Sequence, residues 1–455
     1  MSGDKRVRLK EWLQSGEARV EPLTFPQREL WETSPLPVSD VSNHICATIR
    51  ARGALTAMDV EAALQKLVDR QEVLRSSFLP GKDRSVQMIR NAGRPEVTFH
   101  DLSAAQREPA AIEGSARAVF RKPFDLLQGP LYRVEMFERG KDDHELVFAI
   151  HHAIADGWTL GIFFRDLVAA YIEGIIGPKN GPRPLPFTYS QWGAAERAFW
   201  QPAELERCAG YWKSALAGSR RIWNSSEEPA ALSGDRERWV SQISPVLGRA
   251  VRELARENGA TLFSTLLACF QIAVSKWSGS DDILVGTPVA NRRQQAVRET
   301  MGSFAGLVPL RGRVEHGRNF SDTLRAVHQT TVDSFAHAMP FAELVRALDE
   351  PLSPRRNPIF QIRFALQNHP APDAEVPSLS MQFRLRSTGT ARFDLGCEIN
   401  EGGDALDVAW LYRRDLFGIA DIQKLGDFYQ AVLASVCRSP ETRTGALLEL
   451  STSNL

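Results

Sequence analysis

The strongest constraint on the fold is a stretch in which a buried strand passes into a helix within a few residues. Residues 146–150 form a continuous apolar run rich in β-branched and aromatic side chains, which is typical of a buried strand. Further on, apolar residues recur at helical spacing, namely Leu160, Phe163, Phe164, Leu167, Val168 and Tyr171. His151 and His152 are therefore predicted where a strand ends, close to the free N–H groups of a helix start.

Two adjacent histidines could be a structural pair, a metal half-site or catalytic groups. Adjacent residues on an extended chain point to opposite faces, so His151 and His152 are poorly placed to bind one ion. No paired cysteines or His-rich segment elsewhere offers further ligands. The sequence therefore predicts no metal and leaves the structural and catalytic roles open.

The pattern His151-His152-x-x-x-Asp156-Gly157 resembles the core motif of the condensation domains of nonribosomal peptide synthetases. These belong to the chloramphenicol acetyltransferase-like acyltransferase superfamily. Six further stretches resemble other motifs of the family in the right order, so the resemblance covers residues from about 22 to 440. These stretches are residues 24–31, 70–78, 187–192, 301–311, 339–345 and 356–360. The departures from the family pattern include Gln71 in place of His, Ala305-Gly306 in place of Val-Asn, and Ala342 in place of an acidic residue.

The resemblance implies a role for each residue of the core motif. His152 would serve as the general base toward a hydroxyl acceptor, or orient an amine and accept its proton, which suits a side chain that titrates near neutral pH. Gly157 would leave the thioester carbonyl open to approach, and its N–H would help to hold the oxyanion. Asp156 would form a salt bridge with an arginine, for which Arg292 is the candidate, and His151 would be structural.

The resemblance also implies a substrate tunnel between two halves of the chain. Trp158, Ser303, Ala305 and Gly306 are expected to line or neighbour this tunnel. Because Gly306 stands where the family usually has Asn, we expect extra room there and a bulky or unusual substrate.

The implied fold is α/β: a V-shaped pseudo-dimer of two layered, acetyltransferase-like halves with the site at their interface. The Gly- and Pro-rich residues 178–186 are the best linker in the sequence. They divide the chain into an N-terminal half, residues 1–177, which carries the core motif, and a C-terminal half, residues 187–455. Since one chain supplies both halves, a monomer is expected.

Composition limits the class of partner. The 55 basic residues equal the 55 acidic ones, so no net charge attracts nucleic acid or a membrane surface. Five widely spaced cysteines indicate reduced thiols. The sequence contains no run of 18 apolar residues, so no membrane span is predicted. The charged residues after Met1 are unlike a signal peptide, so a cytoplasmic location is expected.

The resemblance implies an acyl donor held as a thioester on the phosphopantetheine of a carrier protein acting in trans, or on CoA, with no cofactor bound to this chain. The acceptor would be an amine or a hydroxyl. A start at Met1 with a short leader suits a stand-alone enzyme or a starter domain. Two alternatives stay open: a catalytically silent docking module, and a CoA-dependent O-acyltransferase of the wax-ester synthase type.

Overall fold

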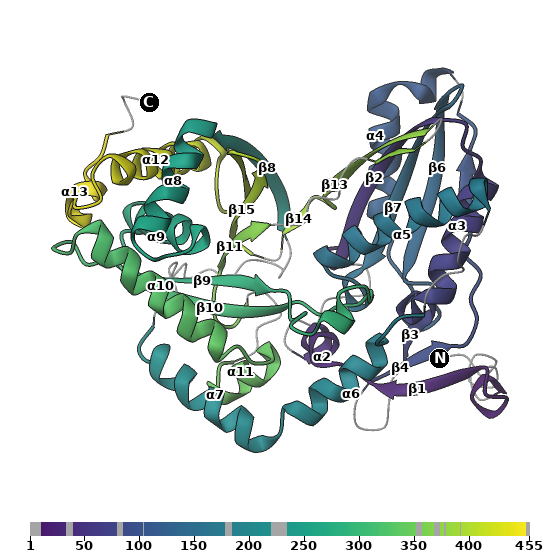
Figure 1. Cartoon of the computed structure of the whole chain (residues 1–455), viewed down its shortest axis with the longest axis horizontal. Helices are drawn as coiled ribbons and strands as arrows, with labels where there is room; N and C mark the ends of the chain where they lie inside the picture. The colour runs from purple at the N-terminus through teal and green to yellow at the C-terminus, as the bar shows by residue number, and fades with distance from the viewer. Residues whose placement is uncertain are drawn as a thin grey trace.

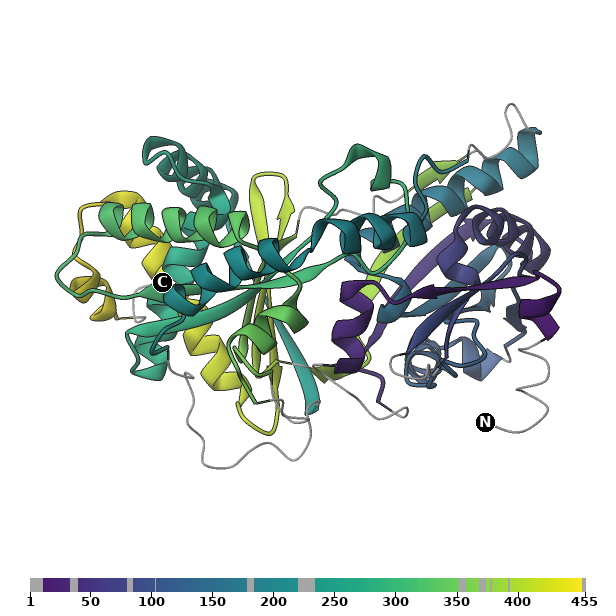
Figure 2. The ribbon, with the colours of Figure 1, turned by 90° about the horizontal axis from the view of Figure 1, so that it is seen from below.

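A computed structural model of the chain shows two lobes that meet in a V (Figure 1). Figure 2, turned by 90°, shows the same two lobes side by side, with helices α6 and α7 running from one to the other. The structure describes residues 11–32, 40–79, 85–102, 104–177, 184–219, 234–351, 357–367, 374–376, 379–391 and 393–451.

The N-terminal lobe is built on a six-stranded sheet in the order β12-β13-β2-β7-β6-β5. Helices α3 and α5 lie side by side on one face of this sheet (Figure 1). A separate three-stranded sheet, β1-β4-β3, lies near the start of the chain. The strands of the lobe are β1 (Ala18–Pro22), β2 (His44–Gly53), β3 (Ser76–Leu79), β4 (Val86–Arg90), β5 (Val97–His100), β6 (Tyr132–Gly140) and β7 (Asp143–His151). The helices are α2 (Phe25–Glu32), α3 (Ala57–Arg70), α4 (Pro109–Phe120) and α5 (Gly157–Ile176), with short 3-10 turns η1 (Glu72–Arg75), η2 (Ala104–Arg107) and η3 (His152–Ile154).

The C-terminal lobe is built on a seven-stranded sheet in the order β10-β9-β11-β15-β16-β8-β14. Its strands are β8 (Gly234–Ile243), β9 (Asp282–Val289), β10 (Gly306–Arg313), β11 (Ile362–Gln367), β14 (Thr390–Ala391), β15 (Leu395–Gly402) and β16 (Ala405–Arg413). The helices from the linker onward are α6 (Tyr189–Phe199), α7 (Pro202–Ala215), α8 (Pro245–Glu257), α9 (Leu262–Ser278), α10 (Phe320–Ala336), α11 (Phe341–Ala347), α12 (Ile419–Arg438) and α13 (Thr444–Leu448), with the turn η4 (Gln295–Val297). α9 is buried along nearly its whole length and forms the centre of this lobe's core.

One strand pair joins the lobes in a way that the order of the chain does not suggest. β12 (Ala374–Val376) and β13 (Leu379–Arg386) belong to the second half of the sequence, yet β13 pairs antiparallel with β2 of the N-terminal sheet from Leu379↔Gly53 to Arg386↔Cys46. Leu379 and Met381 are buried in the N-terminal core. The chain therefore crosses between the lobes again after the linker. The division at residues 178–186 remains a prediction, and residues 178–183 lie outside the described part.

Several local predictions are confirmed. Gly and Asp within residues 139–143 predict a hairpin, and the structure shows it as β6 and β7, connected at Lys141 and Asp142, where Asp142 takes a φ of 57°. The helix expected after the histidines is α5. Thr56 and Asp59 have the residue types and spacing that predict a capping box, and they form one at the start of α3.

Within the described ranges, no single helix is long and apolar enough to cross a membrane. The pair α8 and α9, bent by 106° at the break between them, reaches that length and composition only when the two helices are taken together.

Candidate active site

The two histidines lie where the central strand β7 ends. His151 is the last residue of β7 and pairs with His44 of β2, and its N–H donates to the carbonyl of Leu131 over 2.9 Å. His152 begins the turn η3, and its N–H donates to the carbonyl of Asn43 over 2.7 Å. Backbone bonds to segments on both sides therefore fix this turn in place.

The two side chains have different environments. His151 is buried: its Nδ1 accepts a hydrogen bond from the N–H of Ala153 over 3.1 Å, and its ring packs edge-on against His44 and Phe124. The side chain of His152 is only partly buried. This geometry suits a structural role for His151 and leaves His152 as the more accessible imidazole.

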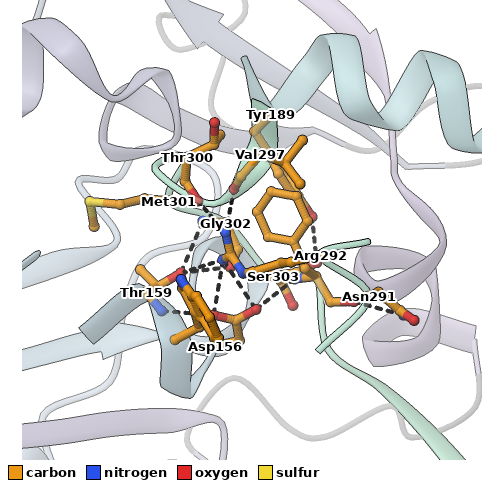
Figure 3. A network of polar contacts seen from close by, with 12 residues as sticks. Asp156, Thr159, Tyr189, Asn291, Arg292, Val297, Thr300, Met301, Gly302 and Ser303 are labelled. Atoms are coloured by element: carbon orange, nitrogen blue, oxygen red, sulfur yellow. Dashed lines mark hydrogen bonds and ion pairs between the residues drawn. The ribbon is translucent and has the colours of Figure 1, made fainter. Parts of the chain in front are cut away.

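Asp156 directly precedes helix α5 and is buried, with 2% of its surface exposed. Its Oδ1 accepts from the N–H of Thr159 over 2.8 Å, so it is the N-cap of the helix. Its Oδ2 accepts from the N–H of Phe304 over 3.1 Å, and Arg292 Nη2 lies 3.2 Å from Oδ1. The structure thus brings together Asp156 and Arg292, the pair expected from the sequence (Figure 3).

Arg292 is buried at the junction between the lobes. Its Nη1 donates to the carbonyls of Val297 and Thr300 over 2.8 and 2.6 Å, and its guanidinium lies 3.8 Å from the ring centroid of Phe304. Burial lowers the pKa of Arg292, and the Asp156 carboxylate opposes this effect. A buried arginine with these partners is a charged structural support.

The loop between β9 and β10, which we call the bridging segment (residues 291–304), comes from the second half of the chain but packs into the N-terminal core. Gln71 binds it at two points: Nε2 donates to the carbonyl of Glu299 over 2.9 Å, and Oε1 accepts from the N–H of Met301 over 2.9 Å. An amide can donate and accept at once, which explains how Gln71 serves where the family usually has His. Thr159 adds two bonds to Gly302 (Figure 3).

Gly157 is the first residue of α5 and is exposed. Beyond its chain neighbours and its own helix, no described heavy atom lies within 4 Å of the position that a Cβ would take. A side chain at position 157 would therefore enter open space, so Gly157 leaves this part of the helix start unobstructed.

The remaining tunnel candidates have different environments. Trp158 is half-buried, and its indole N–H donates to the carbonyl of Arg298 over 3.1 Å. Ser303 is buried, and its carbonyl accepts from the hydroxyl of Tyr189 over 2.8 Å (Figure 3). Ala305 is half-buried, and Gly306 begins β10 and lines a cavity. Their tunnel role remains a prediction.

The cavity that Gly306 lines has a volume of about 260 Å³ and lies between α2, α6, the end of β9 and the loop before α11. Neither histidine is among its described lining residues, but α2 connects the two places, because Gln27 Nε2 donates to the carbonyl of Ala153 over 3.1 Å. We call this the α2–α6 cavity. Its lining residues are Phe25, Pro26, Glu29, Trp192, Ala195, Glu196, Phe199, Trp200, Val289, Asn291, Arg293, Gln294, Val297, Gly306, Ala338, Met339, Pro340 and Phe341.

A side chain at position 306 is expected to narrow this cavity. The Cβ of such a residue would lie 3.0 Å from Nδ2 of Asn291, whose amide donates to the carbonyl of Phe304 over 2.9 Å. For the acyl transfer that the family resemblance implies, we expect Gly306→Asn to lower the rate with large acceptors several-fold more than the rate with small ones, as measured with an acceptor series of increasing size. An unchanged substrate range would contradict the idea that Gly306 provides room.

Sequence reasoning missed several residues of the site. Thr159, Tyr189 and Asn291 bind the bridging segment or the core motif, and Glu196 faces the α2–α6 cavity. Among these, Tyr189 matched a family motif, and that match was the signal available. Within the described ranges, no three His, Cys, Asp or Glu side chains are grouped so that they could hold a metal ion.

Comparisons with known proteins identify the family of the chain. The Condensation domain family matches residues 17–454. The chain is 31% identical over 436 residues to phosphinothricin tripeptide synthetase PhsC of Streptomyces viridochromogenes, and 30% identical over 427 residues to malpibaldin synthetase of Mortierella alpina. The matches cover 94% and 92% of this chain, but only 40% and 8% of those proteins.

Among solved structures, the complex of the X-domain and OxyB from teicoplanin biosynthesis contains a chain with a TM-score of 0.83 and 22% identity, covering 94% of this chain and 96% of that one. This likeness shows the fold, and it confirms the predicted α/β arrangement of two acetyltransferase-like halves. The family match over nearly the whole length, together with the core motif in place at the end of β7, leads to one conclusion. The chain belongs to the condensation-domain family of nonribosomal peptide synthetases.

Proposed function

We propose that this chain transfers an acyl group from a phosphopantetheine thioester on a carrier protein to an amine or hydroxyl acceptor. The observation that carries the proposal is the arrangement of the core motif. His152 is partly accessible on a turn fixed by backbone bonds, and Gly157, a few residues further along the chain, is exposed with an open Cβ position. Acyl transfer requires a proton acceptor fixed in position beside an unobstructed carbonyl.

In the proposed reaction the acceptor nitrogen or oxygen attacks the thioester carbonyl, and His152 accepts the proton that the acceptor loses. The tetrahedral intermediate then collapses, the C–S bond breaks, and the carrier thiol leaves with a proton. The N–H of Gly157 belongs to the first turn of α5 and has no acceptor within the helix, so it supports the proposed contact with the oxyanion.

Asp156 has a different part in this proposal. A carboxylate that oriented His152 would need an oxygen directed at the imidazole. The described contacts of Asp156 are instead with Thr159, Phe304 and Arg292. We therefore assign Asp156 to holding α5 and the bridging segment, so that Gly157 and His152 keep their relative positions.

The second candidate function is a docking module without chemistry. It is favoured by one observation, the fold similarity to an X-domain that is in a complex with OxyB. The intact His152, Asp156 and Gly157 favour the catalytic proposal. A cytoplasmic location and a monomeric state are part of our proposal and follow from the composition and from the two halves in one chain.

An acceptor panel tests the proposed function. The chain is mixed with an acyl donor on a carrier protein, or on CoA, and with paired amine and alcohol acceptors of equal size, and products are read by intact-mass spectrometry. We expect product with the carrier-bound donor and with one acceptor class. Product only from CoA and lipid alcohols would favour the wax-ester alternative. No product with any pair, alongside tight binding of a partner enzyme, would favour the docking module.

Gly157 offers a test that separates access from folding. Because a side chain there would enter open space, Gly157→Leu is expected to change the free energy of unfolding by less than about 0.5 kcal/mol while lowering the acylation rate at least tenfold. Gly174→Leu, in the last turn of the same helix and likewise without neighbours at the Cβ position, is the matched control and should keep the wild-type rate. Equal rates for the two variants would argue against substrate approach past Gly157.

A further inference from the structure

Glu196 of α6 contributes a carboxyl group to the wall of the α2–α6 cavity. Its Oε2 accepts from the N–H of Phe25, the first residue of α2, over 3.2 Å, and its side chain lines the cavity. Burial raises the pKa of Glu196 to about 8, although the bond from Phe25 and the nearby Arg197 and Arg28 act in the opposite direction. Burial therefore outweighs the stabilisation that the anion receives from its surroundings.

The nearby arginines are bound to other groups. Arg28 forms an ion pair with Glu343 of α11 over 3.1 Å, and Arg197 donates to the carbonyl of Leu23 over 3.3 Å. Within the described part of the chain, Glu196 has no ion-pair partner, and its other oxygen, Oε1, has no hydrogen-bond partner. A positive charge in the cavity would therefore stabilise the ionised form of Glu196.

The walls of the cavity suit a cation as well. Five aromatic side chains line it, and the faces of such rings attract cations. One of these rings already holds a cation over its face, since the guanidinium of Arg28 lies 5.1 Å from the ring centroid of Phe25. The five are Phe25, Trp192, Phe199, Trp200 and Phe341.

We propose that the α2–α6 cavity binds a protonated amino group on the side chain of the acceptor, with the Glu196 carboxylate as its counter-ion and the aromatic rings as its walls. This inference rests on the proposed function and names the class of acceptor, one that carries a second, basic amine apart from the group that is acylated. α2 forms one wall of the cavity and also contacts the turn of His152 through Gln27 and Ala153, so the cavity and the turn are positioned by the same helix.

The proposal predicts a definite pH dependence. The ammonium group pairs with ionised Glu196, and below pH 8 the ionised fraction of free Glu196 falls about tenfold per pH unit. Preference for the basic acceptor should therefore rise from pH 6 to pH 8 and level off above it, until the ligand amine itself loses its proton near pH ~10.4. Among the other charged or titratable groups, Glu29 of α2 and Arg293 after β9 line the cavity. Arg28, Tyr189 and Arg197 interact electrostatically with Glu196, and Glu343 of α11 pairs with Arg28.

A matched pair of acceptors tests the specificity. Lysyl and norleucyl groups on the same acceptor carrier present the same α-amine and similar side-chain length, but only lysyl carries the second ammonium. We expect the wild type to acylate lysyl at least tenfold faster at pH 8, and Glu196→Gln to bring the ratio close to one by lowering the lysyl rate. Glu206→Gln, at an exposed position of α7, should keep the wild-type ratio. A wild-type ratio near one, or a preference that survives Glu196→Gln, would overturn the proposal.

Direct binding separates failure of this inference from failure of the proposed function. The fluorescence of Trp192 and Trp200, which line the cavity, is followed during titration with n-butylammonium and with 1-butanol. We expect n-butylammonium to bind at least tenfold more tightly at pH 8, and Glu196→Gln to abolish the difference. If this holds while no acceptor is acylated, the proposed function alone fails. If acylation proceeds but the two probes bind equally, the inference fails.

Discussion

Arg292→Ala should lower the free energy of unfolding by about 3–5 kcal/mol, because it leaves the carboxylate of Asp156 buried without its counter-ion. The carbonyls of Val297 and Thr300 would also lose their donor, which adds to the cost. Because these groups join the N-terminal lobe to the bridging segment, activity should fall together with stability. Denaturant unfolding of the whole chain measures the first effect.

The control for this variant is the neighbouring Arg293→Ala. Arg293 is exposed, and its truncation should change the free energy of unfolding by no more than about 0.5 kcal/mol. The double variant Asp156→Asn/Arg292→Ala should be less destabilised than the sum of the single variants, since neither charge remains buried alone. A loss below about 1 kcal/mol in Arg292→Ala would contradict a structural role for the pair.

His152→Ala should reduce the acylation rate about 10²- to 10⁴-fold, the range expected for removal of a general base. The fold should persist, because the backbone bonds that hold the turn do not involve this side chain. The measurement is the single-turnover rate with saturating donor and acceptor, at equal concentrations of folded protein established by circular dichroism.

Two further histidine variants serve as controls for His152→Ala. His316→Ala removes an exposed imidazole in the C-terminal lobe and should leave the rate unchanged. His151→Ala removes a buried ring that accepts from Ala153 and packs on His44, so it should lower stability as well as rate. If His152→Ala is the only one of the three variants that loses rate while it keeps its stability, the side chain of His152 acts in the reaction and not in the fold.

Much of the site could be predicted because its signals are local. The strand that ends at His151, the helix that follows Asp156 and the turn at Asp142 all depend on neighbours within a few residues. The contact between Asp156 and Arg292 spans 136 positions, and it was predictable only because the family resemblance suggested an arginine partner.

Other features depend on contacts between distant segments and left no local pattern. Pairing of β13 with β2 joins residues more than 300 positions apart, and a short alternating segment does not reveal which sheet it completes. The raised pKa of Glu196 arises from burial between α2 and α6 and cannot be read from the residues around it. Gln71 stood out as a departure from the family, but its two bonds to the bridging segment became visible only in the structure.

The proposed function requires that the acyl group pass directly from the donor carrier to the acceptor, with His152 as the proton acceptor; an acceptor amine presented on a second carrier makes both ends of this transfer visible. The most direct measurement is a single-turnover reaction in which intact-mass spectrometry follows both carriers at once, with wild type and His152→Ala in parallel. We expect the donor carrier to lose the acyl mass, the acceptor to gain the same mass at the same rate, and both changes nearly to vanish in the variant. Donor loss without acceptor gain, or equal transfer by wild type and variant, would contradict it.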